Sequence, residues 1–199
     1  MQGQNDDEAH DKSHQMRGRK GGKRGLCAWL FLSFVSERLG IRFVRPQGGD
    51  GMRVYLDNCC YNRPFDDQSQ PSVRLETEAK LLIQTLMRSG VIEYAWSFEL
   101  RLESSKNPSR QRKRSITAWA DGAIVDIAPA AGIRARAKDL MALGVKAADA
   151  IHLACAESAE CDWFFTVDRG ILKKVRELGN MRIANPVDFV LEGMKWQKS

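Results

Sequence analysis

At residues 163–168 the sequence runs Trp163-Phe164-Phe165-Thr166-Val167-Asp168, a short apolar run that ends in an aspartate. A second run of this kind is Val54-Tyr55-Leu56-Asp57. Both runs are rich in β-branched or aromatic residues and are bounded by turn-forming residues, so each predicts a buried strand. Ligands of open parallel sheets bind at the carboxyl ends of the strands. We therefore expect Asp57 and Asp168 to lie at the functional edge of an α/β sheet.

Strand and helix signals alternate from Met52 onward. Further strands are predicted at residues 92–96, 124–127 and 182–184, and helices at 72–89, 98–103, 109–120, 133–143, 147–158, 171–178 and 186–194. Residues 58–71 are polar and contain Pro64, which predicts a loop. Repeated β-α units of this kind predict a three-layer α/β/α sandwich with a mostly parallel, roughly five-stranded sheet.

The chain of 199 residues is long enough for one well-buried domain, which we place at residues 52–199. Residues 1–51 are expected to be a disordered or non-physiological N-terminal extension, because their first 24 residues are polar and glycine-rich and a glycine cluster precedes Met52. The apolar patch at residues 26–35 is too short to span a membrane. No small-residue cleavage site follows it, which disfavours a secretion signal.

Net charge and cysteine content indicate the kind of partner and the cellular compartment. The net charge of +6 argues mildly for an anionic partner. Five cysteines, an odd number with two adjacent, favour a reducing cytoplasm, and they show no metal-ligand spacing with the three histidines. Cys59 and Cys60 are interpreted as small apolar residues at a strand end. Thiol or redox chemistry at this pair is the weaker alternative.

A third aspartate, Asp149, interrupts the almost wholly apolar helix at residues 147–158. An ionised carboxylate buried there without a partner costs several kcal/mol or shifts its pKa. Its place in the first helical turn gives some relief through the helix dipole. A capping or salt-bridge role and a metal or catalytic role are equally compatible with this position. His152 follows on the same face, where it would orient Asp149 or, more commonly for such a histidine, serve as a packing residue.

A fourth acid is expected from the helix after the second strand, which Ser97 is expected to cap. Glu99 and Glu103 lie on one face of that helix, and the residues alone do not choose between them. Converging carboxylates without a His/Cys set favour Mg²⁺ or Mn²⁺. Such an ion activates water and neutralises charge on the leaving oxygen, which suits phosphodiester hydrolysis.

Several motifs, in this order and spacing, resemble the PIN domain from Met52 to about Leu191. They are Met52-Arg53-Val54-Tyr55-Leu56-Asp57-Asn58, Trp96-Ser97 with Leu102-Glu103 and Asn107-Pro108, Lys146-Ala147-Ala148-Asp149-Ala150-Ile151-His152, Phe165-Thr166-Val167-Asp168, and Asn185-Pro186-Val187-Asp188-Phe189. The resemblance implies that Asp57, Glu103, Asp149 and Asp168 are the acidic quartet that binds Mg²⁺ or Mn²⁺ in these nucleases. Glu99 stays open for the second position, because Glu103 lies one residue further from Ser97 than in many members.

The resemblance also implies roles outside the quartet. Thr166 and Asn58 resemble secondary polar positions beside the metal, although a strand hydroxyl and a turn residue explain them equally well. Stand-alone bacterial PIN domains of this size are commonly VapC-like toxins of type II toxin–antitoxin systems, which cleave RNA until an antitoxin protein binds. The resemblance therefore implies an endoribonuclease, a cognate antitoxin and a homodimer. The cysteines predict a cytoplasmic protein, and the short apolar patch predicts no membrane association.

Two further readings follow from the sequence. Basic side chains are candidates for RNA phosphate contacts, although charge runs on helices are usually solvated faces; they are Arg110, Arg112, Lys113, Arg114, Lys173, Lys174 and Arg176. The alternative function is a non-catalytic PIN-like scaffold that binds RNA or protein. Turnover of RNA that depends on a divalent ion separates the two.

Overall fold

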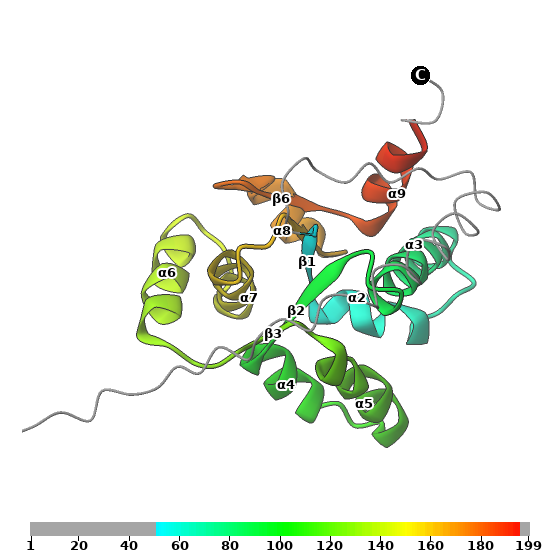
Figure 1. Ribbon diagram of the computed structural model, residues 1–199, viewed down its shortest axis with the longest axis horizontal. Coiled ribbons are helices and arrows are strands. Elements are labelled where there is room, and N and C mark those ends of the chain that lie inside the picture. Colours follow the sequence, from blue (N-terminus) through cyan, green and yellow to red (C-terminus); the bar gives the residue numbers. More distant parts are fainter. Residues whose placement is uncertain (1–50, 196–199) are drawn as a thin grey trace, which may run out of the picture.

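The computed structural model describes residues 51–195, which form a single six-stranded sheet with helices on both faces (Figure 1). The strands lie in the order β3-β2-β1-β4-β6-β5. All neighbouring strands are parallel except β5 and β6, which are antiparallel. Their bounds are β1 (Arg53–Leu56), β2 (Glu93–Ser97), β3 (Val125–Ile127), β4 (Trp163–Phe165), β5 (Glu177–Leu178) and β6 (Met181–Ala184).

The expectations for residues 1–50, including the N-terminal extension and the apolar patch, lie outside the described residues. Within residues 51–195 the α-helices are α2 (Asn58–Asn62), α3 (Pro71–Arg88), α4 (Phe98–Ser105), α5 (Arg110–Thr117), α6 (Ala131–Ala142), α7 (Ala147–Ser158), α8 (Arg169–Lys174) and α9 (Pro186–Lys195). Two 3-10 helices, η1 (Arg63–Phe65) and η2 (Ala118–Gly122), complete the set. None of these helices is both long and apolar enough to cross a membrane.

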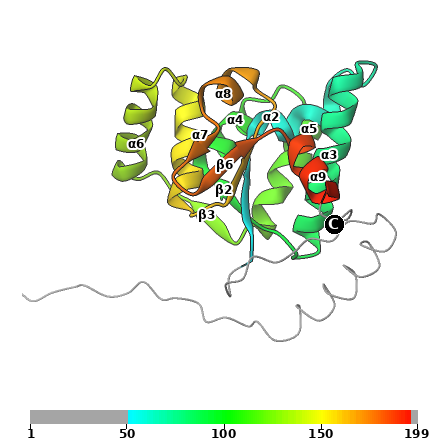
Figure 2. The same ribbon diagram turned by 90° about the horizontal axis from the view of Figure 1, so that it is seen from above.

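Aromatic side chains alternate between the two faces of the sheet. Tyr55 of β1 stacks on Phe164 of β4, with ring centroids 5.5 Å apart, and its hydroxyl reaches α7. Trp163 and Phe165 of β4 instead pack against Phe189 of α9 on the other face. This period of two buries both sides of β4 and fixes its register. The expected three-layer α/β/α sandwich is confirmed, with α6 and α7 on one side and α3 and α9 on the other (Figure 2).

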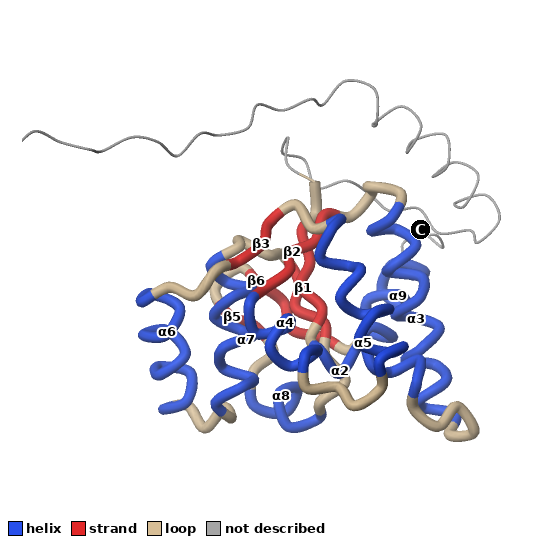
Figure 3. The backbone as a smooth tube through the Cα atoms, turned by 90° about the horizontal axis from the view of Figure 1, so that it is seen from below, coloured by secondary structure: helices blue, strands red, loops and turns tan. Residues whose placement is uncertain are grey.

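Helix α7 packs closely on the sheet because its buried face is built from small residues. Ala150, Ala154 and Ala156 are at most 2% exposed. Since α7 leads directly into β4, its first turn lies at the carboxyl edge of the parallel strands. The helices α2, α4 and α8 start at that same edge, directly after β1, β2 and near the end of β4 (Figure 3). Four elements therefore deliver side chains to one edge.

Two local predictions were wrong. Residues 58–71 contain α2 and η1, because burial of Cys60 and Tyr61 stabilises a short helix that has no helical pattern of its own. The helix predicted at 171–178 ends at Lys174. Glu177 and Leu178 form β5, a hairpin partner of β6 whose turn contains Gly179 at a positive φ of 59°. This hairpin raises the strand number from the expected five to six.

Candidate functional site

Asp57 lies directly after β1, at the centre of the carboxyl edge. Its backbone N–H donates to the Phe165 carbonyl at 2.9 Å, which continues the pairing of β1 with β4. Its carboxylate Oδ2 accepts hydrogen bonds from the Thr166 hydroxyl at 2.8 Å and from the Cys59 thiol at 3.0 Å. The residue is 6% exposed. Protein donors therefore hold this buried carboxylate in one orientation.

Thr166 links Asp57 to the second strand-end acid, Asp168. Its Oγ1 donates to Asp57 and accepts from the Asp168 backbone N–H at 3.0 Å. Asp168 is the N-cap of α8, and its Oδ1 accepts from the Gly170 N–H. A Cβ at Gly170 would lie 2.8 Å from Asp168 Oδ1, so a larger residue here would displace this carboxylate. The two aspartates predicted at strand ends thus share one hydroxyl between them.

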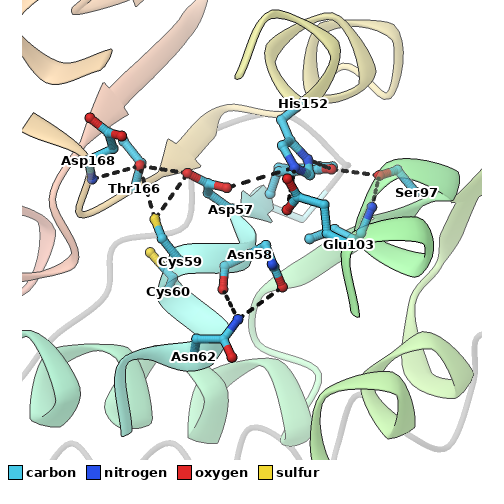
Figure 4. A network of polar contacts seen from close by, with 12 residues as sticks. Asp57, Asn58, Cys59, Cys60, Asn62, Ser97, Glu103, His152, Thr166 and Asp168 are labelled. Atoms are coloured by element: carbon cyan, nitrogen blue, oxygen red, sulfur yellow. Dashed lines mark hydrogen bonds and ion pairs between the residues drawn. The ribbon is translucent and has the colours of Figure 1, made fainter. Parts of the chain in front are cut away.

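Glu103 reaches the edge from α4. Ser97 caps this helix as expected, because its Oγ accepts from the Leu100 N–H. Glu103 Oε2 lies 3.1 Å from His152 Nε2, and Asp57 Oδ1 lies 3.9 Å from the same nitrogen (Figure 4). One side-chain ligand atom from each of Asp57, Glu103 and His152 lies within 4.8 Å of the others. Glu99 is buried in the first turn of α4 and contributes no atom to this cluster, so the geometry favours Glu103.

The contact between Glu103 and His152 shifts the pKa of both groups. The hydrogen bond from His152 lowers the pKa of Glu103, with a further contribution from the Asn58 side chain. Burial opposes the charged imidazole, but the bond to Glu103 and the nearby charges of Asp57 and Glu103 outweigh it and raise the pKa of His152. The two directions agree, because each partner favours the charged form of the other.

Asp149 lies in the first turn of α7 and is partly buried. Burial raises its pKa, and so do the negative charges of Asp57 and Asp168, while Lys146 acts in the opposite direction. Within residues 51–195 its carboxylate has no hydrogen bond or ion pair. Three aspartates from β1, α7 and the end of β4 therefore lie close enough to repel one another. The capping role considered for Asp149 is not seen, as no side-chain cap closes α7.

Asn58 follows Asp57 and belongs to a ladder of amide side chains. Its Oδ1 accepts from Asn62 Nδ2 at 3.2 Å, and Asn62 Oδ1 accepts from Asn107 Nδ2 at 3.1 Å. The ladder ties α2 to the turn that follows α4. It therefore helps to fix the distance between Asp57 and Glu103.

Sequence reasoning undervalued two side chains of this site. His152 was expected to be a packing residue or a partner of Asp149, yet it bonds to Glu103. The available signal was its position on the same helical face as Asp149. Cys59 was interpreted as a small apolar residue, and that was wrong, since its thiol donates to Asp57. No sequence signal indicates this contact, which exists only because α2 starts where β1 ends.

Thiol chemistry at Cys59 and Cys60 is disfavoured by the same environment. The neighbouring Cys60 thiol, burial and the charge of Asp57 raise the pKa of Cys59 well above its usual value. A thiol with a raised pKa is a weak nucleophile. All four described cysteines are free.

The basic side chains predicted to contact RNA divide into two groups. Arg112, Lys113 and Lys174 donate to backbone carbonyls of Phe65, Ser105 and Gly144. Arg110, Arg114, Lys173 and Arg176 are exposed. Two further lysines, Lys106 and Lys146, act on the charges of Glu103 and Asp149 respectively. From the sequence, Lys146 is a candidate for a phosphate contact, with a solvated lysine as the favoured interpretation.

The donor set fits a hard divalent cation. Carboxylate oxygens converge from Asp57 and Glu103, and burial together with the charges of Asp57 and Asp168 raises the pKa of Asp149. Hard cations of the Mg²⁺ type prefer such oxygen ligands. A bound cation would relieve the repulsion among the aspartates.

Comparison with known proteins assigns the fold to a family. The family model described as PIN domain matches residues 54–178, so the chain belongs to the PIN domain family. PIN domains are generally nucleases. No curated protein matches the chain. Among solved structures, the chain is similar to the crystal structure of VapBC2 from Rickettsia felis bound to a DNA fragment from their promoter, with 14% identity and a TM-score of 0.43 over 67% of this chain and 98% of that chain.

Proposed function

We propose that this protein is a divalent-metal-dependent ribonuclease that hydrolyses RNA phosphodiester bonds. The observation that carries the proposal is the cluster of Asp57 and Glu103 with His152, whose ligand atoms lie within 4.8 Å of one another. Asp149 lies near enough for the charges of Asp57 and Asp168 to act on it, and its carboxylate has no hydrogen bond or ion pair within residues 51–195. Converging acids without a balancing cation favour a metal-binding role over a structural one. Membership of the PIN family agrees with this role.

Each side chain has a proposed task in this function. Asp57, Asp149 and Asp168 hold Mg²⁺ or Mn²⁺, and Glu103 acts as a further ligand or as the base that orients the attacking water. When bound, the ion supplies activation of water and neutralisation of the charge on the leaving oxygen. Thr166 holds the Asp57 carboxylate in place through its 2.8 Å hydrogen bond. Lys106 and Lys146 supply positive charge for an RNA phosphate beside the acids.

We further propose that the protein is the toxin of a type II toxin–antitoxin pair. In this role it acts in the cytoplasm, as a homodimer whose activity a cognate antitoxin blocks. Support comes from the PIN assignment together with the resemblance to stand-alone bacterial toxins of this size. The four free cysteines fit a reducing compartment. Co-expression with the product of the neighbouring gene tests the pair: co-purification and loss of RNA cleavage are expected, and independent behaviour of the two proteins contradicts the toxin role.

Cleavage of a labelled RNA by the purified full chain tests the nuclease proposal. We expect cleavage with Mg²⁺ or Mn²⁺, none with EDTA, and loss of cleavage in Asp149→Asn. Asp126→Asn is the matched control, since Asp126 is an exposed acid of β3 already paired with Arg101 at 2.6 Å. Circular dichroism should show both variants folded. Cleavage that persists in EDTA contradicts the proposal, and RNA binding without turnover in a folded sample favours the scaffold alternative.

A further inference from the structure

A chain of buried polar side chains lies behind Glu103. Ser97 Oγ lies 2.6 Å from the Tyr55 hydroxyl, which lies 2.7 Å from His152 Nδ1, and His152 Nε2 lies 3.1 Å from Glu103 Oε2 (Figure 4). Ser97 and Tyr55 are fully buried and His152 is 1% exposed. The chain joins β2, β1, α7 and α4. Buried polar groups in such a chain define one geometry, because a lost partner leaves the other group unsatisfied.

Proton counting fixes the direction of the contact with Glu103. An ionised carboxylate only accepts hydrogen bonds, so His152 Nε2 carries the hydrogen. In the neutral imidazole, Nδ1 then accepts from Tyr55, and Tyr55 in turn accepts from Ser97. In the imidazolium, Nδ1 donates to Tyr55, and Tyr55 donates to Ser97. In the neutral arrangement every donor of the chain has an acceptor within it, and in both arrangements the Nε2–H faces Glu103.

Neither ring nitrogen of His152 is free to bind a metal ion in these arrangements. A ring nitrogen binds a cation through its lone pair. With Nε2 protonated toward Glu103 and Nδ1 occupied by Tyr55, His152 has no lone pair to offer, although Nε2 lies within 4.8 Å of the acid oxygens. The cluster of Asp57, Glu103 and His152 is thus two oxygen donors with a histidine that orients one of them.

We propose that His152 is a positioning residue that fixes the Glu103 carboxylate through its Nε2–H and does not bind metal, with Tyr55 and Ser97 holding the ring. The Glu103 side chain is 26% exposed, and nothing else in the described part of the chain is bonded to it except the Asn58 side chain. Fixing a glutamate side chain costs conformational entropy. Because His152 already orders the Glu103 side chain in the folded protein, this entropy is not lost again when metal or substrate binds.

The catalytic consequence rests on the proposed ribonuclease function, whereas the hydrogen-bond geometry does not. Nitrogen-15 NMR of the full chain, without RNA, therefore tests the geometry independently. His152 is assigned as the imidazole signal that disappears in His152→Gln, apart from those of His10 and His14. We expect Nε2 to be protonated before and after addition of Mg²⁺, and its shift to change in Glu103→Gln. Loss of the Nε2 proton on addition of Mg²⁺ overturns the proposal.

Substitutions at His152 test the role. His152→Gln keeps a donor for Glu103 and an acceptor for Tyr55, whereas His152→Leu removes both at similar volume. We expect the leucine variant to lose about 10- to 100-fold in kcat or in Mn²⁺ affinity with little change in the KM for RNA, and the glutamine variant to recover most of this loss. Equal damage in both variants contradicts a positioning role.

Tyr55→Phe is a milder variant, in case His152→Leu fails to fold. It keeps the ring stacking on Phe164 and removes only the hydroxyl that holds Nδ1. We expect an intermediate loss of Mn²⁺ affinity, measured by calorimetry without RNA, and a change in the His152 tautomer signals. If the NMR and Mn²⁺ results hold while no variant or wild-type chain cleaves RNA, the ribonuclease proposal fails and the positioning role stands. Unchanged Mn²⁺ affinity and unchanged tautomer signals overturn it.

Discussion

Two aspartates of the candidate site, Asp57 and Asp149, differ in how the surrounding protein stabilises their negative charge. Asp57 is buried and accepts hydrogen bonds from Thr166 and Cys59. Asp149 has no such donor within residues 51–195, and burial together with Asp57 and Asp168 raises its pKa. The difference shows that one part of the site is completed by folding alone. The other part carries negative charges whose repulsion a bound cation would reduce.

The largest effect is expected from Asp57→Asn. The substitution removes the charge that Thr166 and Cys59 stabilise, so we expect a loss of about 1–3 kcal/mol in unfolding free energy. As a proposed metal ligand its loss should also lower RNA cleavage at least about 100-fold. Urea unfolding in EDTA measures the first effect. A variant as stable as the wild type would break the comparison, because Asp57 would then not depend on its protein donors.

Lys80 of α3 is a buried charge outside the proposed site, so it tests whether a buried charge without an ion-pair partner in residues 51–195 can occur away from a functional site. Lys80 is 4% exposed, and burial lowers its pKa from 10.5 to about 8. The unfolded chain binds more protons between these values, so the lysine lowers stability fully below about pH 8, and stability recovers as the pH rises toward 10.5. Lys80→Met should therefore add up to about 3 kcal/mol at pH 7.

Chemical unfolding from pH 7 to pH 10 measures this gain, which should shrink as the pH rises. RNA cleavage should not change, since Lys80 lies beside the Tyr61 ring and forms no ion pair with a carboxylate of residues 51–195. A gain that is independent of pH would show that packing, not charge, is responsible.

Asp149→Asn sharpens the comparison directly. Without metal it removes repulsion and should raise stability by about 0.5–1 kcal/mol, the opposite sign to Asp57→Asn. In saturating Mg²⁺ the wild type should be the more stable of the two, because the variant binds the ion more weakly and gains less stability from it. Thermal unfolding with EDTA and with Mg²⁺ provides both values. Destabilisation in EDTA would mean that Asp149 has a structural partner.

The smallest effect is expected for Asp126→Asn. Asp126 pairs with Arg101, but both side chains are more than half exposed. Exposed ion pairs contribute little, so we expect a change below about 0.5 kcal/mol and unaltered cleavage. A larger loss of unfolding free energy, measured in urea, would indicate that charged residues of the sheet outside the site also contribute to stability.

The sequence predicts the strands and the main helices because apolar patterns report burial directly. The range of α7 was predicted to the residue, and Asp57 and Asp168 were placed correctly beyond strand ends. The short helix α2 and strand β5 were missed, since each is stabilised by distant partners and not by its own pattern. The bond between His152 and Glu103 joins residues 49 positions apart. Contacts of this kind depend on tertiary packing, which periodicity does not report.

Gly170 gives this site a point of control that is separate from folding. Its missing Cβ leaves room for Asp168 Oδ1, which would otherwise lie 2.8 Å away. The obstructed atom is the end of a flexible side chain, so an added methyl group would displace the carboxylate more readily than the backbone. We therefore expect Gly170→Ala to keep the fold, measured by circular dichroism, and to weaken the proposed RNA cleavage by moving the Asp168 carboxylate.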